Sequence, residues 1–135
     1  MTRRVLIVDD EVTLRNSLRD ALRLASYEVS EAQDGTEGLD QAQKVKPDVI
    51  LMDVKMPGID GYETCRKLKE GPTTCGIPVI FVTATTDLVV NRLAYGAGGI
   101  ACLTKPFRLE ALLGLIDAAI ASAKRAEPLT EPLTA

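Results

Sequence analysis

Short apolar runs alternate with amphipathic stretches along the chain. Four of the runs are continuously apolar, which is typical of strands buried on both faces of a parallel sheet. They cover residues 5–8, 49–52, 79–82 and 101–103. A fifth stretch, residues 27–32, alternates weakly between apolar and polar side chains and predicts an edge strand.

Between these runs, leucine and alanine recur at the spacing of an amphipathic helix. The predicted helices cover about residues 14–25, 36–44, 62–70, 87–95 and 109–124. In the first helix the leucines form the inner face, so Arg15, Arg19 and Asp20 are expected to face water. Asp34 and Gly35 predict a turn. Five strands interleaved with five helices predict an α/β fold, a three-layer sandwich with right-handed crossovers.

The length of 135 residues indicates one domain, expected over residues 1–125. Residues 126–135 repeat Glu-Pro-Leu-Thr twice and show no apolar periodicity. This tail is expected to be either a frayed end or a linker cut from a longer protein.

Composition excludes several classes of function. The net charge of −3 and the lack of a basic stripe argue against nucleic-acid binding by this segment. Because histidine is absent, the chain holds no Ser-His-Asp triad, no Cys-His pair and no His-ligated metal. The longest apolar stretch, residues 111–123, is too short to span a membrane. Three cysteines without CxxC spacing and no signal peptide indicate a reducing cytoplasm.

Reactive side chains follow four of the predicted strands: Asp9 and Asp10, Asp53, Thr83 and Lys105. The carboxyl ends of parallel strands share one edge of a sheet, so these groups should converge. Together they could hold a hard divalent cation and a phosphoryl group, with Asp53 as nucleophile. Taken singly, an aspartate here could only cap the next helix, and a lysine could only be solvated. Capping alone does not explain the adjacent carboxylates of Asp9 and Asp10. They repel each other, and their proximity becomes favourable when a cation neutralises them.

The motifs around these residues resemble the receiver domain of two-component response regulators over about residues 3–124. The resemblance rests on four stretches: Val8-Asp9-Asp10-Glu11, residues 51–61 around Asp53, Val82-Thr83-Ala84 and Leu103-Thr104-Lys105-Pro106-Phe107. It implies a flavodoxin-like sheet of order 2-1-3-4-5, an order that comes from the resemblance alone.

The resemblance also implies a role for each site residue. Asp53 would accept a phosphoryl group from a histidine kinase, a phosphotransfer protein or a small acyl phosphate. Asp10, Asp53 and the backbone carbonyl of Lys55 would ligate Mg²⁺, with Mn²⁺ able to substitute, and Asp9 would act mostly through water. Lys105 would pair first with Asp53 and then with a phosphoryl oxygen.

Further roles follow from the same resemblance. The Thr83 hydroxyl and the Ala84 amide would bind other phosphoryl oxygens. The Lys105–Pro106 bond would be cis. Beyond accepting the phosphoryl group and losing it again by hydrolysis, the chain is expected to be no enzyme.

Two features modify this expectation. Cys102 stands where the family usually carries an aromatic switch residue, which puts an aromatic switch in doubt; we interpret it as a small inert residue. In the resemblance, Lys55 and Thr85 flank the path of the attacking water and cannot serve it as a base, so hydrolysis is predicted to be slower than in chemotaxis-type members of the family. Alternatively, the side chain of Lys55 points to solvent and only its backbone carbonyl matters.

Phosphorylation is expected to switch a surface formed by the fourth helix, the last strand and the last helix. Apolar residues outside the core stripe of the last helix favour a phosphorylation-dependent homodimer there. These residues are Ala111, Leu115, Ala118 and Ala119. Helix propensity explains an alanine-rich helix about equally well.

Two other functions are weighed against the receiver. A phosphohydrolase of the haloacid-dehalogenase type also uses an aspartate at a strand end, but it usually carries a second aspartate two residues later, where this chain has Lys55. A binding module that no longer takes phosphate is disfavoured by the complete set of site residues.

Overall fold

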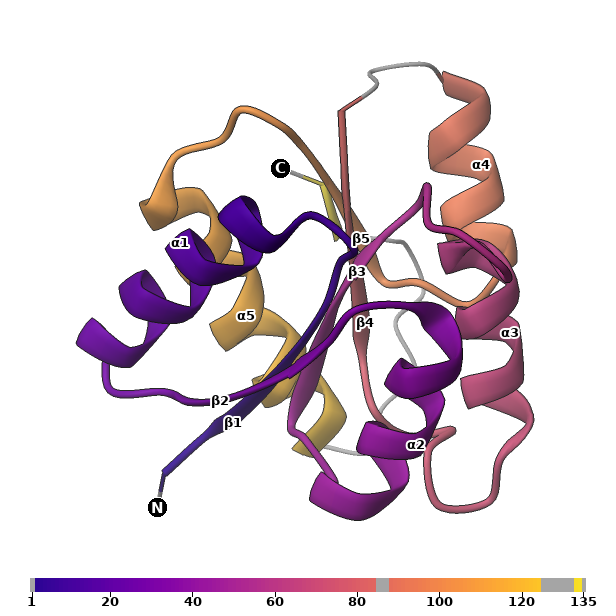
Figure 1. Cartoon of the computed structure of the whole chain (residues 1–135), viewed down its shortest axis with the longest axis horizontal. Helices are drawn as coiled ribbons and strands as arrows, with labels where there is room; N and C mark the ends of the chain where they lie inside the picture. The colour runs from indigo at the N-terminus through magenta and orange to yellow at the C-terminus, as the bar shows by residue number, and fades with distance from the viewer. Residues whose placement is uncertain (1, 85–87, 125–132, 135) are drawn as a thin grey trace.

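A parallel sheet lies at the centre of the molecule and is covered by helices on both faces (Figure 1). The computed structural model describes residues 2–84, 88–124 and 133–134. The strands are β1 Arg4–Val8, β2 Glu28–Ala32, β3 Val49–Asp53, β4 Val79–Thr83, β5 Ala101–Thr104 and β6 Leu133–Thr134. The helices are α1 Val12–Leu24, α2 Gly35–Val45, α3 Gly61–Glu70, α4 Leu88–Gly96 and α5 Leu109–Lys124.

The strand order β2-β1-β3-β4-β5 confirms the predicted flavodoxin-like fold. The chain moves from β1 outward to β2 and then returns to β3 on the other side of β1. The crossovers on the two sides of this switch run in opposite directions, which opens a crevice at the carboxyl ends of β1 and β3.

The tail adds a sixth strand that the sequence did not predict. The two residues of β6 pair in parallel with Ala101 and Cys102 of β5. A strand of this length has no apolar period to detect, and its pairing uses backbone groups that every residue carries.

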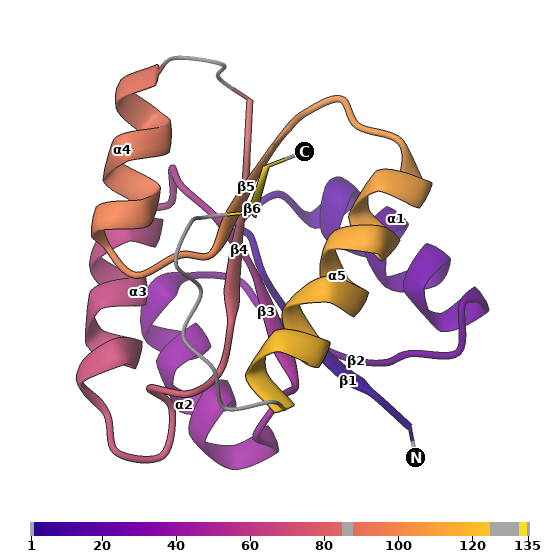
Figure 2. The ribbon, with the colours of Figure 1, turned by 180° about the vertical axis from the view of Figure 1, so that it is seen from behind.

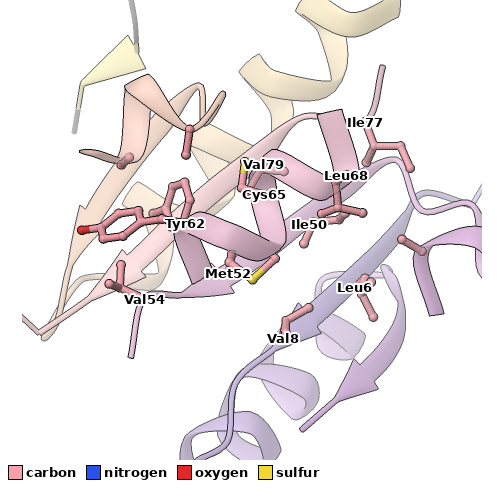
Figure 3. Close-up of a cluster of buried hydrophobic side chains, with 14 of the residues drawn as sticks. Leu6, Val8, Ile50, Met52, Val54, Tyr62, Cys65, Leu68, Ile77 and Val79 are labelled. Carbon is pink, nitrogen blue, oxygen red and sulfur yellow. The ribbon is translucent and has the colours of Figure 1, made fainter. Parts of the chain in front are cut away.

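Alternate side chains of the central strands serve two separate cores. Leu6 and Val8 point into the core under α2, α3 and α4, whereas Val5 and Ile7 point into the core under α1 and α5. Figure 3 shows the first core, a cluster that joins side chains of β1 and β3 with Cys65 and Leu68 of α3. Both faces of these strands are buried, which explains their continuously apolar sequence.

Two aspartates cap helices on the same face of the sheet. Asp60 caps α3, and its carboxylate accepts a hydrogen bond of 2.9 Å from the backbone N–H of Glu63. Asp34 caps α2 in the same way, with a bond of 2.8 Å from Glu37. The chain bends at Asp34 as predicted, but Gly35 is already the first residue of α2, since an aspartate favours both a turn and a helix cap.

The outer faces of α1 and α5 differ from the prediction at specific residues. Arg15 does not face water: its side chain is only 14% exposed and is held by the carbonyl oxygen of Asp9, just after β1, and by Glu31 on β2. In α5, Leu115 and Ala119 are 8% and 0% exposed and belong to the core. Because α5 packs across the sheet (Figure 2), its buried face is wider than the predicted stripe. Among the described residues, no helix is both long and apolar enough to cross a membrane.

Candidate functional site

The carboxyl ends of four strands bring the predicted reactive residues together. A cleft of about 410 Å³ lies at this edge of the sheet. Its lining consists of Asp10, Glu11, Asp53, Lys55, Thr83, Ala84 and Lys105. Asp9 lies just below them and is buried. The sequence thus predicted every described member of this cleft except Glu11.

Three carboxylates crowd one side of the cleft. Oxygen atoms of Asp9, Asp10 and Asp53 all lie within 4.8 Å of one another. Like charges at this separation repel, and a divalent cation would neutralise them. Because all the donors are hard oxygens, the set suits Mg²⁺ or a cation of similar chemistry. The residues present therefore fit the cation that the resemblance implies.

Lys105 supplies the positive charge opposite the carboxylates. Its Nζ lies 3.4 Å from Oδ2 of Asp9 and 3.6 Å from Oδ1 of Asp53. Its backbone N–H donates to the carbonyl oxygen of Thr83 at 2.7 Å, and the Lys105–Pro106 peptide bond is cis. The ammonium group, which follows β5, thus faces the carboxylates of both Asp9 and Asp53.

Asp53 is harder to ionise than an ordinary aspartate. The pKa of Asp53 is raised to about 6, because burial and the nearby charges of Asp9 and Asp10 together outweigh the lowering effect of Lys105 and of the Val54 N–H. The Val54 N–H donates to Oδ1 of Asp53 at 2.9 Å. At neutral pH the carboxylate is mostly ionised, yet it is more basic than a solvated one, which suits a nucleophile.

The two acids of the pair occupy different settings. Asp9 accepts a bond of 2.9 Å from the N–H of Glu11 at Oδ1 and faces Lys105 with Oδ2. Asp10 is exposed and lines the cleft directly. The carboxylate of Asp10 is therefore the one presented to a ligand in the cleft.

The loop after β3 brings the backbone back beneath Asp53. The N–H of Gly61 donates to the carbonyl oxygen of Val54 at 2.8 Å. A Cβ atom at residue 61 would collide with the carbonyl oxygen of Asp53. Within the loop, Gly58 takes a positive φ of 79°, which glycine adopts without strain. Both glycines thus let the chain turn closely around Asp53.

We expect Gly61→Ala to destabilise the protein by about 1–3 kcal/mol, because the new methyl group must displace the backbone of Asp53. Urea denaturation measures this loss. Gly76→Ala is the matched control, since a Cβ there meets nothing within 4 Å, and it should change stability by less than about 0.5 kcal/mol. Equal stabilities of the two variants would contradict the close approach.

The remaining predicted residues lie as follows. Thr83 is buried at the end of β4, and Ala84 is exposed in the cleft lining. Thr85 lies outside the described residues. Cys102 is half-buried and packs against the core under α3 and α4, and burial raises the pKa of its thiol. A raised thiol pKa lowers reactivity, which supports our interpretation of Cys102 as inert.

Sequence reasoning missed Glu11 and Arg15. Glu11 lines the cleft, and Arg15 donates from Nη1 to the carbonyl oxygen of Asp9 at 2.6 Å. The only sequence signal for either residue is its position just after the acidic pair, at the start of the next helix.

Comparisons with known proteins place the chain in one family. Residues 5–117 match the family model "Response regulator receiver domain". Response regulator MprA of Mycobacterium sp. (strain KMS) is 43% identical over 116 residues, which cover 85% of this chain and 49% of the relative. The chain thus spans about half the length of the curated relatives it matches.

Solved structures give the same result over their whole length. Chemotaxis protein CheY4 of Vibrio cholerae, crystallised at low pH, superposes with a TM-score of 0.84 at 33% identity, covering 88% of this chain and 99% of the other. A CheY-like receiver domain protein from Methanospirillum hungatei gives a TM-score of 0.86 at 28% identity, covering 94% and 100%.

Proposed function

Because the chain belongs to the response regulator receiver domain family, we propose that it accepts a phosphoryl group on Asp53 in a cation-dependent reaction. The observation that carries the proposal is the cluster at the edge of the sheet. Carboxylate oxygens of Asp9, Asp10 and Asp53 lie within 4.8 Å of one another, and Lys105 faces two of the three residues.

The proposed step is an in-line displacement at phosphorus. A carboxylate oxygen of Asp53 forms a bond to phosphorus as the bond from phosphorus to the donor, a histidine nitrogen or an acyl oxygen, breaks. The leaving group keeps the electron pair of the broken bond. The product is an aspartyl phosphate, which water later hydrolyses to inorganic phosphate and the free carboxylate.

Each residue of the cleft has a part in this step. Lys105 holds the Asp53 carboxylate before transfer, and its ammonium then neutralises a phosphoryl oxygen. The Thr83 hydroxyl and the Ala84 N–H would donate to the other phosphoryl oxygens from the end of β4.

We assign the cation to Asp10, Asp53 and the carbonyl oxygen of Lys55, with Asp9 acting through water. Both carboxylate oxygens of Asp9 already face other donors, which supports the indirect role. When bound, Mg²⁺ or Mn²⁺ would supply positive charge to the transferring phosphoryl group.

Labelling with acetyl phosphate tests the proposal. The protein should gain one phosphate in Mg²⁺ and none in excess EDTA, as weighed by intact-protein mass spectrometry. Steady turnover of a phosphate ester would instead favour the phosphohydrolase. The position two residues after Asp53 is the exposed Lys55, which supplies no carboxyl group for the acid–base step of such an enzyme.

We further propose that the donor is a histidine kinase or a phosphotransfer protein. A largely apolar groove of about 500 Å³ adjoins the cleft and shares Glu11 and Lys105 with it. The groove runs between α1 and the segment before α5, where Leu14, Ser17 and Phe107 line it. A donor protein that brings its phosphohistidine into the cleft would cover this groove.

Ser17→Arg fills the groove without removing a core residue, because Ser17 is exposed. We expect phosphotransfer from a cognate donor protein to fall at least about tenfold, since a long charged side chain there opposes docking. Labelling by acetyl phosphate, which needs no docking, should stay within twofold. Gln43→Arg on exposed α2 is the control of equal charge. Equal losses with both donors would show damage to the cleft and contradict the groove as a docking site.

We propose that Lys55 helps to protect the aspartyl phosphate from water. Lys55 is exposed and lines the cleft beside Asp53. We expect Lys55→Asn to release phosphate severalfold faster, because a carboxamide can orient the attacking water. Phosphate release in Mg²⁺ measures the rate, with Lys67→Asn on α3 as control and Thr85→Glu as a second test of the same water path. Unchanged rates in both Lys55→Asn and Thr85→Glu would refute this role.

The output surface remains a proposal on α4, β5 and α5. Leu115, one of the residues that suggested this surface, lies in the core and is not available for contact with a partner. Leu93 of α4 is 42% exposed and is therefore the residue to change. Light scattering of wild type and Leu93→Glu, before and after phosphorylation, would detect the proposed homodimer.

We also propose a cytoplasmic location, which the three free cysteines support.

A further inference from the structure

Arg15 connects the acidic pair to the neighbouring strand. Its side chain lies on the first turns of α1 and is only 14% exposed. Nη1 donates to the carbonyl oxygen of Asp9 at 2.6 Å, and Nε donates to Oε1 of Glu31 on β2 at 3.3 Å. None of the steps proposed above uses this side chain.

The carbonyl group that Arg15 holds belongs to the peptide bond between Asp9 and Asp10. A peptide group is planar, so fixing its oxygen also sets the direction in which the chain enters Asp10. The other side of Asp9 is fixed as well, because its N–H donates to the carbonyl oxygen of Ala32 at 3.1 Å. Asp10 itself lies past the last paired residue of β1, where the sheet no longer constrains the backbone.

The charge of Arg15 is neutralised by Glu31 on β2, which does not line the cleft. Glu31 accepts from Arg15 at Oε1 and from Arg19, one helical turn later, at Oε2 at 3.4 Å. A guanidinium is a planar fork and can hold a carbonyl oxygen and a carboxylate at once, which the single nitrogen of lysine cannot do in the same geometry. The hydrogen bond from Arg15 to the Asp9 carbonyl therefore affects the orientation of the acidic pair more than its electrostatics.

We propose that Arg15 is a positioning residue of the cation site. By donating to the Asp9 carbonyl while Glu31 anchors its guanidinium, Arg15 aims the carboxylate of Asp10 at the space between Asp9 and Asp53. The inference rests on the proposed function only in taking that space as the cation site. It assigns no chemical step to Arg15.

The test is the affinity for Mg²⁺ alone, without any phosphoryl donor. Titration of the full chain with MgCl₂, followed by amide NMR signals of the cleft, gives the dissociation constant. Arg15→Met keeps the length of the side chain but removes the fork, and it should weaken binding about tenfold or more, as loss of a group that orients a metal ligand does. Arg15→Lys keeps the charge and should weaken binding severalfold. Arg19→Met, which also loses a contact to Glu31 but touches no part of the acidic pair, should stay within twofold.

The outcomes separate this inference from the proposed function. Wild type that binds no Mg²⁺ would overturn both the cation site and the role of Arg15. Wild-type Mg²⁺ affinity in either Arg15 variant would overturn the role of Arg15 and leave the cation site intact. A loss of affinity in Arg19→Met as large as that in Arg15→Met would do the same. Urea denaturation in EDTA shows whether each variant is folded. A merely structural role would lower that stability without changing the Mg²⁺ affinity, and Arg15→Lys keeps the test valid if Arg15→Met fails to fold.

Discussion

Asp53→Asn is expected to accept no phosphoryl group from acetyl phosphate or from a donor protein. A carboxamide lacks the anionic oxygen that attacks phosphorus, so the loss should be complete at this residue. Intact-protein mass spectrometry after incubation in Mg²⁺ measures it. Asp60→Asn is a suitable control, because Asp60 is a helix cap in the loop after β3 and lies outside the cleft lining, so that variant should be labelled like wild type. An Asp53→Asn variant that still gains phosphate would contradict the assignment.

The same substitution should stabilise the metal-free protein. The folded-state pKa of Asp53 lies near 6, above its ordinary value of 3.8, because burial and Asp9 disfavour the charged form. Between these two values the folded protein binds more protons than the unfolded chain, so wild-type stability falls as pH rises from about 4 to 6 and stays low above it. Asparagine does not titrate there, and its advantage at neutral pH should be about 1–3 kcal/mol after allowance for partial exposure.

Urea denaturation in EDTA across this pH range tests the sign. We expect the advantage of Asp53→Asn to be greatest above pH 6 and to shrink towards pH 4, where wild-type Asp53 is protonated. An advantage that grows on acidification would show that Asp53 is stabilised, not strained, by its surroundings.

Asp10→Ala is expected to weaken Mg²⁺ binding by about two orders of magnitude. It removes a ligand and a charge from a cluster of only three carboxylates. The free energy of unfolding in EDTA should rise at the same time, because Asp10 raises the pKa of Asp53 and its loss relieves this repulsion. Calorimetric or NMR titration with MgCl₂ measures the affinity, and Glu70→Ala on the exposed end of α3 is the control. A metal-free variant less stable than wild type would contradict the repulsion.

The sequence predicted the core of the fold because burial leaves a clear pattern. The runs at residues 5–8, 49–52 and 79–82 are apolar on both faces, and the structure buries both faces. The carboxyl ends of these strands then had to meet at one edge, which is why Asp10, Asp53 and Thr83 could be grouped from the sequence alone.

Features that depend on contacts with distant parts of the same chain could not be predicted in this way. Arg15 looks like a surface residue in the helical pattern, and only the positions of Glu31 and the Asp9 carbonyl, elsewhere in the fold, make it a half-buried one. Leu115 was assigned to the surface because helical periodicity does not give the width of the buried face, which depends on how α5 crosses the sheet. The pairing of β6 depends on backbone groups alone.

The most direct test of the central claim is to trap the modified residue in the wild-type protein. Borohydride reduces an acyl phosphate to an alcohol, so treatment after incubation with acetyl phosphate and Mg²⁺ converts a phosphorylated aspartate into homoserine. We predict homoserine at residue 53, found by peptide mass spectrometry, and unmodified aspartate at residues 9 and 10. Reduction at another residue, or no reduction in a protein that has gained phosphate, would contradict the assignment of Asp53 as the phosphoryl acceptor.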